Sequence, residues 1–155
     1  MLEGRRYRLH PTAEQADEMS QWFGALRALW NVALEHRQIM WRQWRRPIGF
    51  GDQCRELTAW RHEEGWVGSV SQSAQQQVLR DLDRAFQNWW GGTHRAPTFR
   101  ARQTAASMRM PAKECGAPEA LDRRWGQLRL AKLGRIRARQ TRALGGRIRS
   151  VTIKR

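Results

Sequence analysis

Apolar residues recur every three or four positions in three stretches of the first half of the chain. This spacing places them on one face of a helix and predicts helices over residues 13–46, 52–64 and 71–92. Thr12 and Gln15 have the spacing of a capping box, which marks the start of the first helix. The first half of the sequence therefore predicts three amphipathic helices.

Strict alternation of apolar and basic residues predicts β-strands at both ends of the chain. Tyr7 and Leu9 alternate with arginines, and residues 127–140 and 147–155 show the same pattern. Ile148 falls on the opposite phase to Val151 and Ile153, so the closing strand is expected to be bulged or shorter than its pattern. One isolated strand cannot satisfy its own backbone polar groups, so the opening strand must pair with a strand from the last third of the chain. The closing strand is the simplest partner, and residues 112–126 are expected to form a loop.

The order of these elements predicts an α+β fold. Its first strand lies in residues 1–10, three helices follow in residues 11–92, and the remaining strands lie in residues 93–155. The helices are then an insertion in a small β-barrel or curled sheet. Strand-rich barrels coated with arginine are a common platform for nucleic acids.

The charge is concentrated in the last third of the chain. The formal net charge is +15, and residues 98–155 alone carry +13, whereas residues 47–97 carry −1. Only three of the 29 cationic side chains are lysines, and the planar fork of arginine suits phosphate and stacked bases. A basic segment with a strand pattern favours nucleic acid as the partner over a membrane surface, which requires a basic helix with a broad apolar face.

Neither cysteine chemistry nor a membrane segment is indicated. Cys54 and Cys115 are isolated in the sequence, so no zinc knuckle or disulfide framework is predicted. No apolar stretch approaches the roughly 20 residues that span a bilayer, and the opening residues have no signal-peptide core. These features are typical of a cytoplasmic protein.

Aromatic residues fall into two groups by their helical phase and their neighbours. One group has the spacing of a buried face and is expected in the core: Trp22, Phe23, Trp30, Phe86 and Trp89. The other group is flanked by arginines and either stacks on bases or is buried: Trp41, Trp44 and Trp60.

Eleven residues are predicted to contact nucleic acid: Arg27, Asn31, Phe50, Gln72, Gln76, Arg80, Arg109, Arg129, Arg135, Arg137 and Arg139. The last four alternate along strands, so one face presents several cations to phosphates. The two glutamines and Arg80 share a helical stripe that either reads base edges or is simply solvated. Arg27 and Asn31, one turn apart, either contact phosphate or form a structural polar pair. No catalytic residue is predicted, and no histidine has the spacing of a metal ligand.

Several motifs resemble, in order, those of the TnpB (OrfB) proteins encoded by bacterial insertion sequences. The family has counterparts to the stretches YRLHPTAEQ, SQSAQQQVLRDLDRAFQNWW, APTFRAR, LRLAKLGRIRAR and GGRIRSVTIKR. The first match extends to the following helix and is carried by Tyr7, Arg8, Leu9, Pro11, Thr12, Gln15, Gly24, Arg27, Asn31, Ala33 and Leu34. The resemblance covers nearly the whole chain.

Members of this family are RNA-guided DNA endonucleases related to compact type V CRISPR effectors. The resemblance implies a wedge-like, OB-like barrel interrupted by a three-helix recognition domain with helix-turn-helix character. It implies guide RNA and double-stranded or unwound DNA as partners. In full-length members a RuvC-like nuclease domain follows the barrel and binds Mg²⁺ through three carboxylates.

This chain is expected to lack the nuclease domain and to hold no cofactor of its own. Residues 98–155 offer only Glu114, Glu119 and Asp122, all in the expected loop, whereas metal-dependent cleavage needs convergent carboxylates. We therefore expect the nucleic-acid-binding N-terminal portion of a TnpB-like protein, at the bacterial nucleoid, that does not cut DNA by itself. The sequence leaves three alternatives open: a stand-alone DNA-binding regulator, a truncated frame without function, and a subunit completed by a separate nuclease chain.

Overall fold

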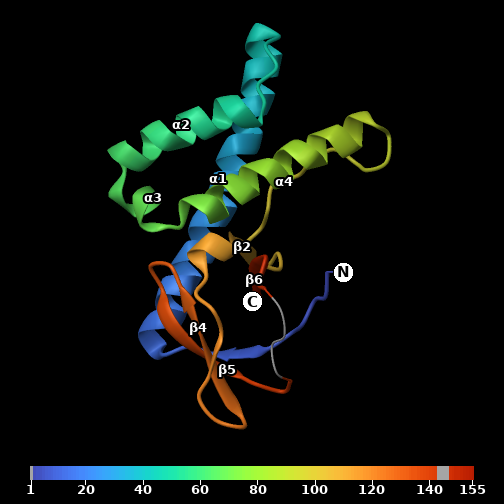
Figure 1. Ribbon diagram of the computed structural model, residues 1–155. Coiled ribbons are helices and arrows are strands. Elements are labelled where there is room, and N and C mark those ends of the chain that lie inside the picture. The colour runs from blue at the N-terminus through green and yellow to red at the C-terminus, as the bar shows by residue number, and fades with distance from the viewer. Residues whose placement is uncertain (1, 143–146) are drawn as a thin grey trace. The chain divides into compact units, whose positions relative to one another are not determined.

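The computed structural model describes residues 2–142 and 147–155 and has an α+β fold (Figure 1). The helices are α1 (Ala13–Trp44), α2 (Phe50–Glu63), α3 (Gly65–Ser69) and α4 (Gln72–Trp90). The strands are β1 (Arg8–His10), β2 (Ser107–Pro111), β3 (Glu119–Ala120), β4 (Trp125–Leu130), β5 (Gly134–Arg139) and β6 (Ser150–Lys154), with a 3-10 turn at Ala112–Glu114. None of the helices in these described ranges is long and apolar enough to cross a bilayer.

The chain divides into two compact units. Met1–Gln21 and Met110–Thr152 form the first, which we call the sheet unit. Trp22–Arg109 and Ile153–Arg155 form the second, which we call the helical unit. Each unit is described separately below.

The sheet unit contains a four-stranded antiparallel sheet in the order β1-β5-β4-β3. Strands β4 and β5 form a hairpin with Leu128 opposite Ile136, as the alternating sequence predicts. On one face of this hairpin, Leu130 and Ile136 are fully buried. Strands β2 and β6 form a separate two-stranded sheet. Over the residues described, the strands do not close into a barrel, so the predicted barrel is not confirmed.

The opening strand does pair with the last third of the chain, but its partner differs from the expected one. Strand β1 pairs with β5, placing Leu9 opposite Ala138, and the closing strand β6 pairs with β2 instead. Alternation shows which face of a strand is buried and not which strand lies beside it, so the sequence pattern could not fix this choice. The prediction that β1 pairs with the final strand was therefore wrong.

The region expected to be a loop contains short regular elements. Residues 112–126 include the 3-10 turn and strand β3, which pairs with β4 through Glu119 and Gln127. Strand β2, just before this region, was not predicted either. Its two buried methionines, Met108 and Met110, alternate with the exposed Arg109, which is a strand pattern too short to recognise in the sequence.

In the helical unit, α2 and α4 cross the second half of α1 (Figure 1). Burial confirms the apolar faces predicted for α1 and α4; the large buried side chains on these two helices include Trp22, Phe23, Leu26, Trp30, Leu34, Leu79, Leu82 and Phe86. Trp89 is the exception, because it is 42% exposed one residue before the end of α4. The short helix α3 was not predicted.

The ends of α4 follow the sequence signals. The hydroxyl of Ser71 accepts the N–H of Ala74 at 3.2 Å and caps the first turn. At the other end, Gly92 adopts the left-handed backbone with a φ of 75°, which a glycine tolerates best. A serine before the first turn and a glycine after the last turn are thus the residues that begin and end α4.

Candidate nucleic-acid interface

Strand β5 presents a row of arginines on the exposed face of the four-stranded sheet. Arg135, Arg137 and Arg139 alternate with less exposed residues and therefore lie on the same side of the strand. Arg129 on β4 lies opposite Arg135, and Arg8 on β1 lies opposite Arg139, so both belong to that side as well. All five side chains are exposed. We call these five residues the arginine face.

A tryptophan sits among these cations. The guanidinium carbons of Arg137 and Arg139 each lie 5.5 Å from the ring centroid of Trp125, within the range of a cation–π contact. The imidazole of His10 meets the same ring edge-on, with centroids 4.9 Å apart. Trp125 therefore restrains two neighbouring guanidinium groups on the open face of the sheet.

Two acidic groups near this face, Asp122 and Glu119, accept hydrogen bonds from neighbouring residues, and Arg137 also helps to lower the pKa of Asp122. Asp122 accepts the backbone N–H groups of Arg124 at 2.6 Å and Trp125 at 2.8 Å. These hydrogen bonds lower the pKa of the Asp122 carboxyl from its ordinary value. At the edge of the sheet, Glu119 accepts a 2.6 Å hydrogen bond from the amide of Gln127.

The first turn of α1 is tied to the β4–β5 hairpin through one side chain. The side-chain oxygen of Gln15 accepts the backbone N–H of Thr12 at 3.0 Å, and the Thr12 hydroxyl accepts the backbone N–H of Gln15 at 3.2 Å. The predicted capping box is therefore confirmed. The Gln15 amide nitrogen also donates to the carbonyls of Leu133 at 3.2 Å and Arg135 at 2.8 Å. One glutamine thus caps the helix and fixes the turn that leads into the arginine-bearing strand.

The predicted residues of the helical unit form a second group. Gln72, Gln76 and Arg80 lie four residues apart along one side of α4, with Gln72 and Arg80 exposed and Gln76 half-buried. The guanidinium carbon of Arg80 lies 5.0 Å from the ring centroid of Phe50, at the start of α2. The structure thus brings Phe50 and Arg80 together. Arg109 is exposed on β2.

Asn31 is engaged by the chain itself. Its amide donates to the carbonyl of Arg100 at 3.1 Å and its side-chain oxygen accepts the N–H of Arg100 at 2.8 Å. The Arg100 guanidinium carbon lies 3.7 Å from the ring centroid of Trp30, and burial lowers the pKa of that guanidinium. Arg27, one turn before Asn31, is half-buried. For Asn31, the structural alternative raised by the sequence is the one that the geometry favours.

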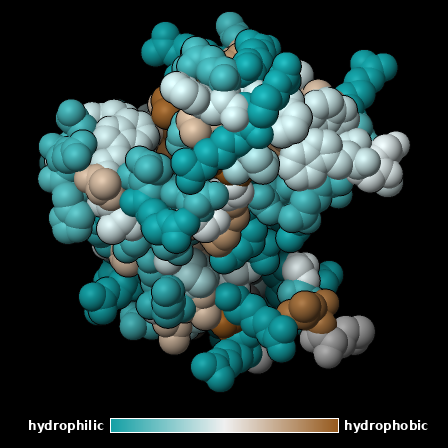
Figure 2. Space-filling model, turned by 90° about the horizontal axis from the view of Figure 1, so that it is seen from above, coloured by the Kyte–Doolittle hydropathy of each residue, from teal (hydrophilic) through white to brown (hydrophobic). Residues whose placement is uncertain are grey.

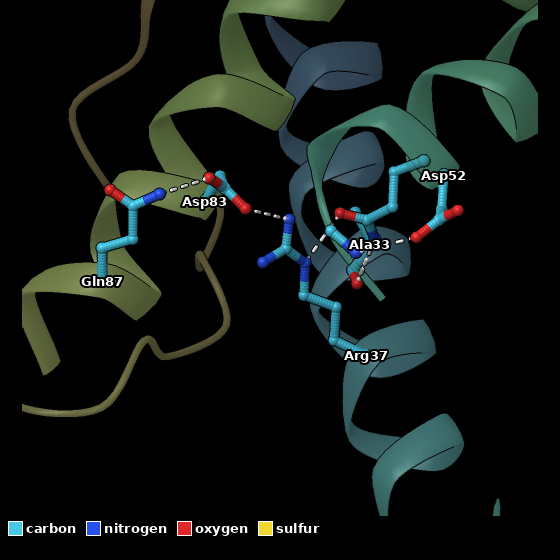
Figure 3. A network of polar contacts seen from close by, with 7 residues as sticks. Ala33, Arg37, Asp52, Asp83 and Gln87 are labelled. Carbon is cyan, nitrogen blue, oxygen red and sulfur yellow. Dashed lines mark hydrogen bonds and ion pairs between the residues drawn. The ribbon is translucent and has the colours of Figure 1, made fainter. Parts of the chain in front are cut away.

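A buried polar network holds the helices of this unit together and was not predicted from the sequence (Figure 3). Arg37 on α1 donates to Gln53 on α2 at 2.8 Å and forms an ion pair with Asp83 on α4 at 2.9 Å. Gln53 in turn donates to the carbonyl of Ala33, and Gln87 donates to Asp83. Among the described residues, Asp83 therefore pairs with an arginine of α1 and not with Arg80 or Arg84 of its own helix.

The arginine-flanked tryptophans differ in their exposure. Trp41 and Trp44, near the end of α1, are exposed, whereas Trp60 on α2 is half-buried and meets Trp66 edge-on. Figure 2 looks at the molecule from above and shows a largely hydrophilic surface interrupted by pale side chains of intermediate hydropathy. The measured exposure places Trp41 and Trp44 at the surface of the helical unit.

The structure offers little for metal or thiol chemistry in the ranges that it describes. No group of three histidine, cysteine, aspartate or glutamate side chains is placed to hold a metal ion there. Both cysteines are free thiols. Burial is the main cause that raises the pKa of Cys115 to about 11, with a smaller effect from Glu114, so this thiol is unreactive near neutral pH.

Comparison with known sequences defines the class of protein. A family model described as a helix-turn-helix domain, that of the OrfB proteins of the IS605 type, matches residues 1–46. This match and the relatives below confirm the resemblance drawn from the sequence motifs. The chain is a TnpB/OrfB-family sequence.

Two relatives are informative. A "Putative RNA-guided DNA endonuclease" from Streptomyces pristinaespiralis is 33% identical over 129 residues, which are 82% of this chain and 31% of that protein. The "Putative RNA-guided DNA endonuclease InsQ" from Escherichia coli K12 is 28% identical over 154 residues, which are 98% of this chain and 37% of that protein. The chain thus spans about a third of the length of these curated relatives.

The matched residues do not themselves form two helices joined by a turn. In residues 1–46, strand β1 is followed by one uninterrupted helix of 32 residues, α1. A recognition helix in a helix-turn-helix arrangement therefore cannot be assigned within this range. Two candidate binding surfaces remain. They are the arginine face and the side of α4 that carries Gln72, Gln76 and Arg80, which we call the α4 stripe.

Proposed function

We propose that the chain is the nucleic-acid-binding part of a TnpB/OrfB-type RNA-guided endonuclease and that the arginine face binds phosphates of guide RNA and target DNA. The observation that carries this proposal is the alignment of Arg135, Arg137 and Arg139 on one exposed face of the sheet. The names of the two relatives supply the class of partner. Such a protein works at the bacterial nucleoid.

The geometry of the arginine face suits a polyphosphate chain. Alternate residues of a strand are about 6.6 Å apart, a distance comparable to the spacing of successive phosphates along a nucleic-acid strand. A guanidinium group donates two parallel hydrogen bonds to phosphate oxygens. Because Trp125 already restrains Arg137 and Arg139, less side-chain freedom is lost when they bind.

The α4 stripe supplies a second class of contact in this proposal. Gln72 and Gln76 carry amides that donate and accept at the same time, which suits the edge of adenine, and Arg80 suits guanine or phosphate. Phe50 holds the Arg80 guanidinium on one side and leaves its donors free to turn toward a ligand. We assign base-edge or target-DNA contacts to this stripe.

We further propose that this chain does not cleave DNA by itself. Magnesium-dependent hydrolysis of a phosphodiester requires carboxylates that converge on the metal. The donor set of the described ranges does not fit that requirement, because Asp122 is engaged in a turn and Glu119 is hydrogen-bonded to Gln127. No cleavage step is therefore assigned to any residue of this chain.

A salt titration tests the proposal. Binding of labelled structured RNA should weaken as salt rises, because each neutralised phosphate releases counterions. The double variant Arg137→Gln/Arg139→Gln should lower the slope of log K against log salt by about 1.4 to 1.8, at roughly 0.7–0.9 per phosphate. The matched control is Arg5→Gln/Arg55→Gln, which removes the same charge from arginines paired with Glu3 and Asp52.

Two results would contradict the proposal. The first is that the parent chain fails to retain RNA or DNA at low salt. The second is that the two double variants reduce the salt slope equally, since the effect would then follow net charge and not the arginine face.

A further inference from the structure

The last turn of α1 carries an exposed group of aromatic and cationic side chains. It consists of Trp41, Arg42, Trp44, Arg45 and Arg46, which we call the Trp41/Trp44 surface. Trp41 is 52% exposed and Trp44 is 70% exposed, although tryptophan is usually highly buried. Because the two residues are three positions apart on a helix, their rings lie on neighbouring parts of the same side.

The cations of this surface form no salt bridge in the ranges that the structure describes, although Arg46 lies near enough to Asp52 to help lower the pKa of that carboxyl. The salt bridges in the described ranges involve Arg5, Arg37 and Arg55, and none involves the three arginines of the Trp41/Trp44 surface. The guanidinium carbon of Arg45 lies 5.8 Å from the ring centroid of Trp41. The surface therefore combines aromatic faces with cations that form no ion pair in the described part of the chain.

The backbone at this point is also unusual. Arg45 adopts the left-handed conformation with a φ of 49°, and its N–H bonds to the carbonyl of Trp41 at 3.1 Å. This conformation is uncommon for a residue other than glycine and is concentrated at functional sites. Here it ends the helix and directs Arg45 back over the ring of Trp41.

We propose that the Trp41/Trp44 surface stacks on unpaired bases of a bound nucleic acid, an inference that rests on the proposed function. Unpaired bases expose the π-faces that tryptophan stacks on, whereas a duplex buries them between neighbouring pairs. The arginines hold the phosphates that flank the stacked bases. The arginine face supplies charge for any polyphosphate, and the Trp41/Trp44 surface adds a preference for single-stranded segments.

Another exposed tryptophan provides a matched contrast. Trp66 on α3 is 50% exposed, close to the value of Trp41, but it follows Glu63 and Glu64 in the chain and meets Trp60 edge-on. Acidic neighbours repel phosphate. Trp66 should therefore not contact nucleic acid, although it has a similar exposed area.

The test compares a labelled oligouridylate with a labelled RNA duplex by fluorescence anisotropy, using the full chain. Trp44→Ala should weaken binding of the oligouridylate by about fivefold or more, and Trp41→Ala/Trp44→Ala should weaken it further. Trp44→Phe should retain most of the affinity because phenylalanine keeps a π-face. Duplex binding should change less than twofold, and Trp66→Ala should leave both ligands unaffected.

A second measurement does not depend on variants. A photoreactive thiouridine in the oligonucleotide should crosslink to residues 41–46, as located by mass spectrometry. Unchanged oligouridylate affinity in the double variant, together with crosslinks outside residues 41–46, would overturn the inference. The proposed function would still stand if the parent chain bound the RNA duplex. The inference would also be overturned if the double variant lost binding to anionic vesicles but kept its affinity for the oligouridylate. The surface would then be a lipid-binding surface. If the parent chain bound neither RNA, both proposals would fail.

Discussion

Asn31 and Arg100 form a reciprocal pair: the side-chain amide of Asn31 bonds to both the N–H and the carbonyl of Arg100. The residues are 69 positions apart, and Arg100 lies in a segment without regular secondary structure. The indole of Trp30 also donates to the carbonyl of Thr98 at 2.9 Å. Hydrogen bonds from one turn of α1 therefore hold residues 98–100 in position, as a neighbouring strand would do in a sheet.

Asn31→Ala should destabilise the helical unit. It removes both hydrogen bonds and leaves two half-buried backbone groups of Arg100 without partners, at a cost of about 1–3 kcal/mol. Urea unfolding followed by circular dichroism measures the change. Gln43→Ala on the exposed side of the same helix should stay within about 0.5 kcal/mol of the parent, and an equal loss in both variants would contradict this role for Asn31.

The Arg37–Asp83 pair should be strongly coupled. Arg37 is buried and Asp83 is about a quarter exposed, so Asp83→Ala leaves a mostly desolvated guanidinium with Gln53 and the Phe86 ring as partners and should cost about 2–4 kcal/mol. In a double-mutant cycle with Arg37→Met, the double variant should lose less stability than the two single losses added together. Additive losses would show that the two charges do not interact.

Gln15 offers a way to separate two roles within one side chain. Gln15→Glu keeps the oxygen that accepts the Thr12 N–H but loses the donor to Leu133 and Arg135, whereas Gln15→Ala loses both. Each lost hydrogen bond should cost about 1 kcal/mol, so the alanine variant should be the less stable one. Hydrogen exchange at the amides of the β4–β5 hairpin should increase in both variants, and protection unchanged in either would contradict the tie to the hairpin.

Asp122 should make stability depend on pH in the acid range. Its pKa is lowered in the folded state, so its stabilising contribution is fully present above the unfolded value, near pH 4, and is lost as pH falls through the folded value. Asp122→Asn keeps an accepting oxygen but cannot titrate. The difference in unfolding free energy between parent and variant should therefore shrink below about pH 4. A difference that stays constant from pH 6 to the acid limit would rule out this contribution.

Trp125 should act on nucleic-acid affinity through the two arginines beside it. Trp125→Leu keeps an apolar side chain but removes both cation–π contacts, each of which is worth about 0.5–1 kcal/mol at an exposed site. RNA affinity should fall by roughly two- to tenfold, while the salt slope stays unchanged because the number of cations is the same. A lower slope would indicate that the arginine face itself had been displaced.

The long helices and the β4–β5 hairpin could be predicted from the sequence because their signals are local. The capping box at Thr12, the cap at Ser71 and the alternation around Ile136 each report on residues a few positions away. The same alternation predicts that Arg135, Arg137 and Arg139 lie on one side of a strand, as the structure shows.

The sequence pattern could not predict which residues far apart in the chain contact each other. The pairing of β1 with β5, the amide of Asn31 on Arg100 and the ion pair of Arg37 with Asp83 all join residues far apart in the chain. Periodicity contains no information about such pairs. Trp89 was misplaced for a related reason, because its helical phase is that of the core but α4 ends one residue later.

The choice of arginine at all five positions of the arginine face has a consequence for control. A guanidinium group keeps its proton at every pH that a cell reaches, so a change in pH cannot remove the positive charge of this surface. Lysine acetylation cannot neutralise it either. In the proposed function, release of a bound strand must therefore come from competing ions, a competing polyanion or a change in the strand itself.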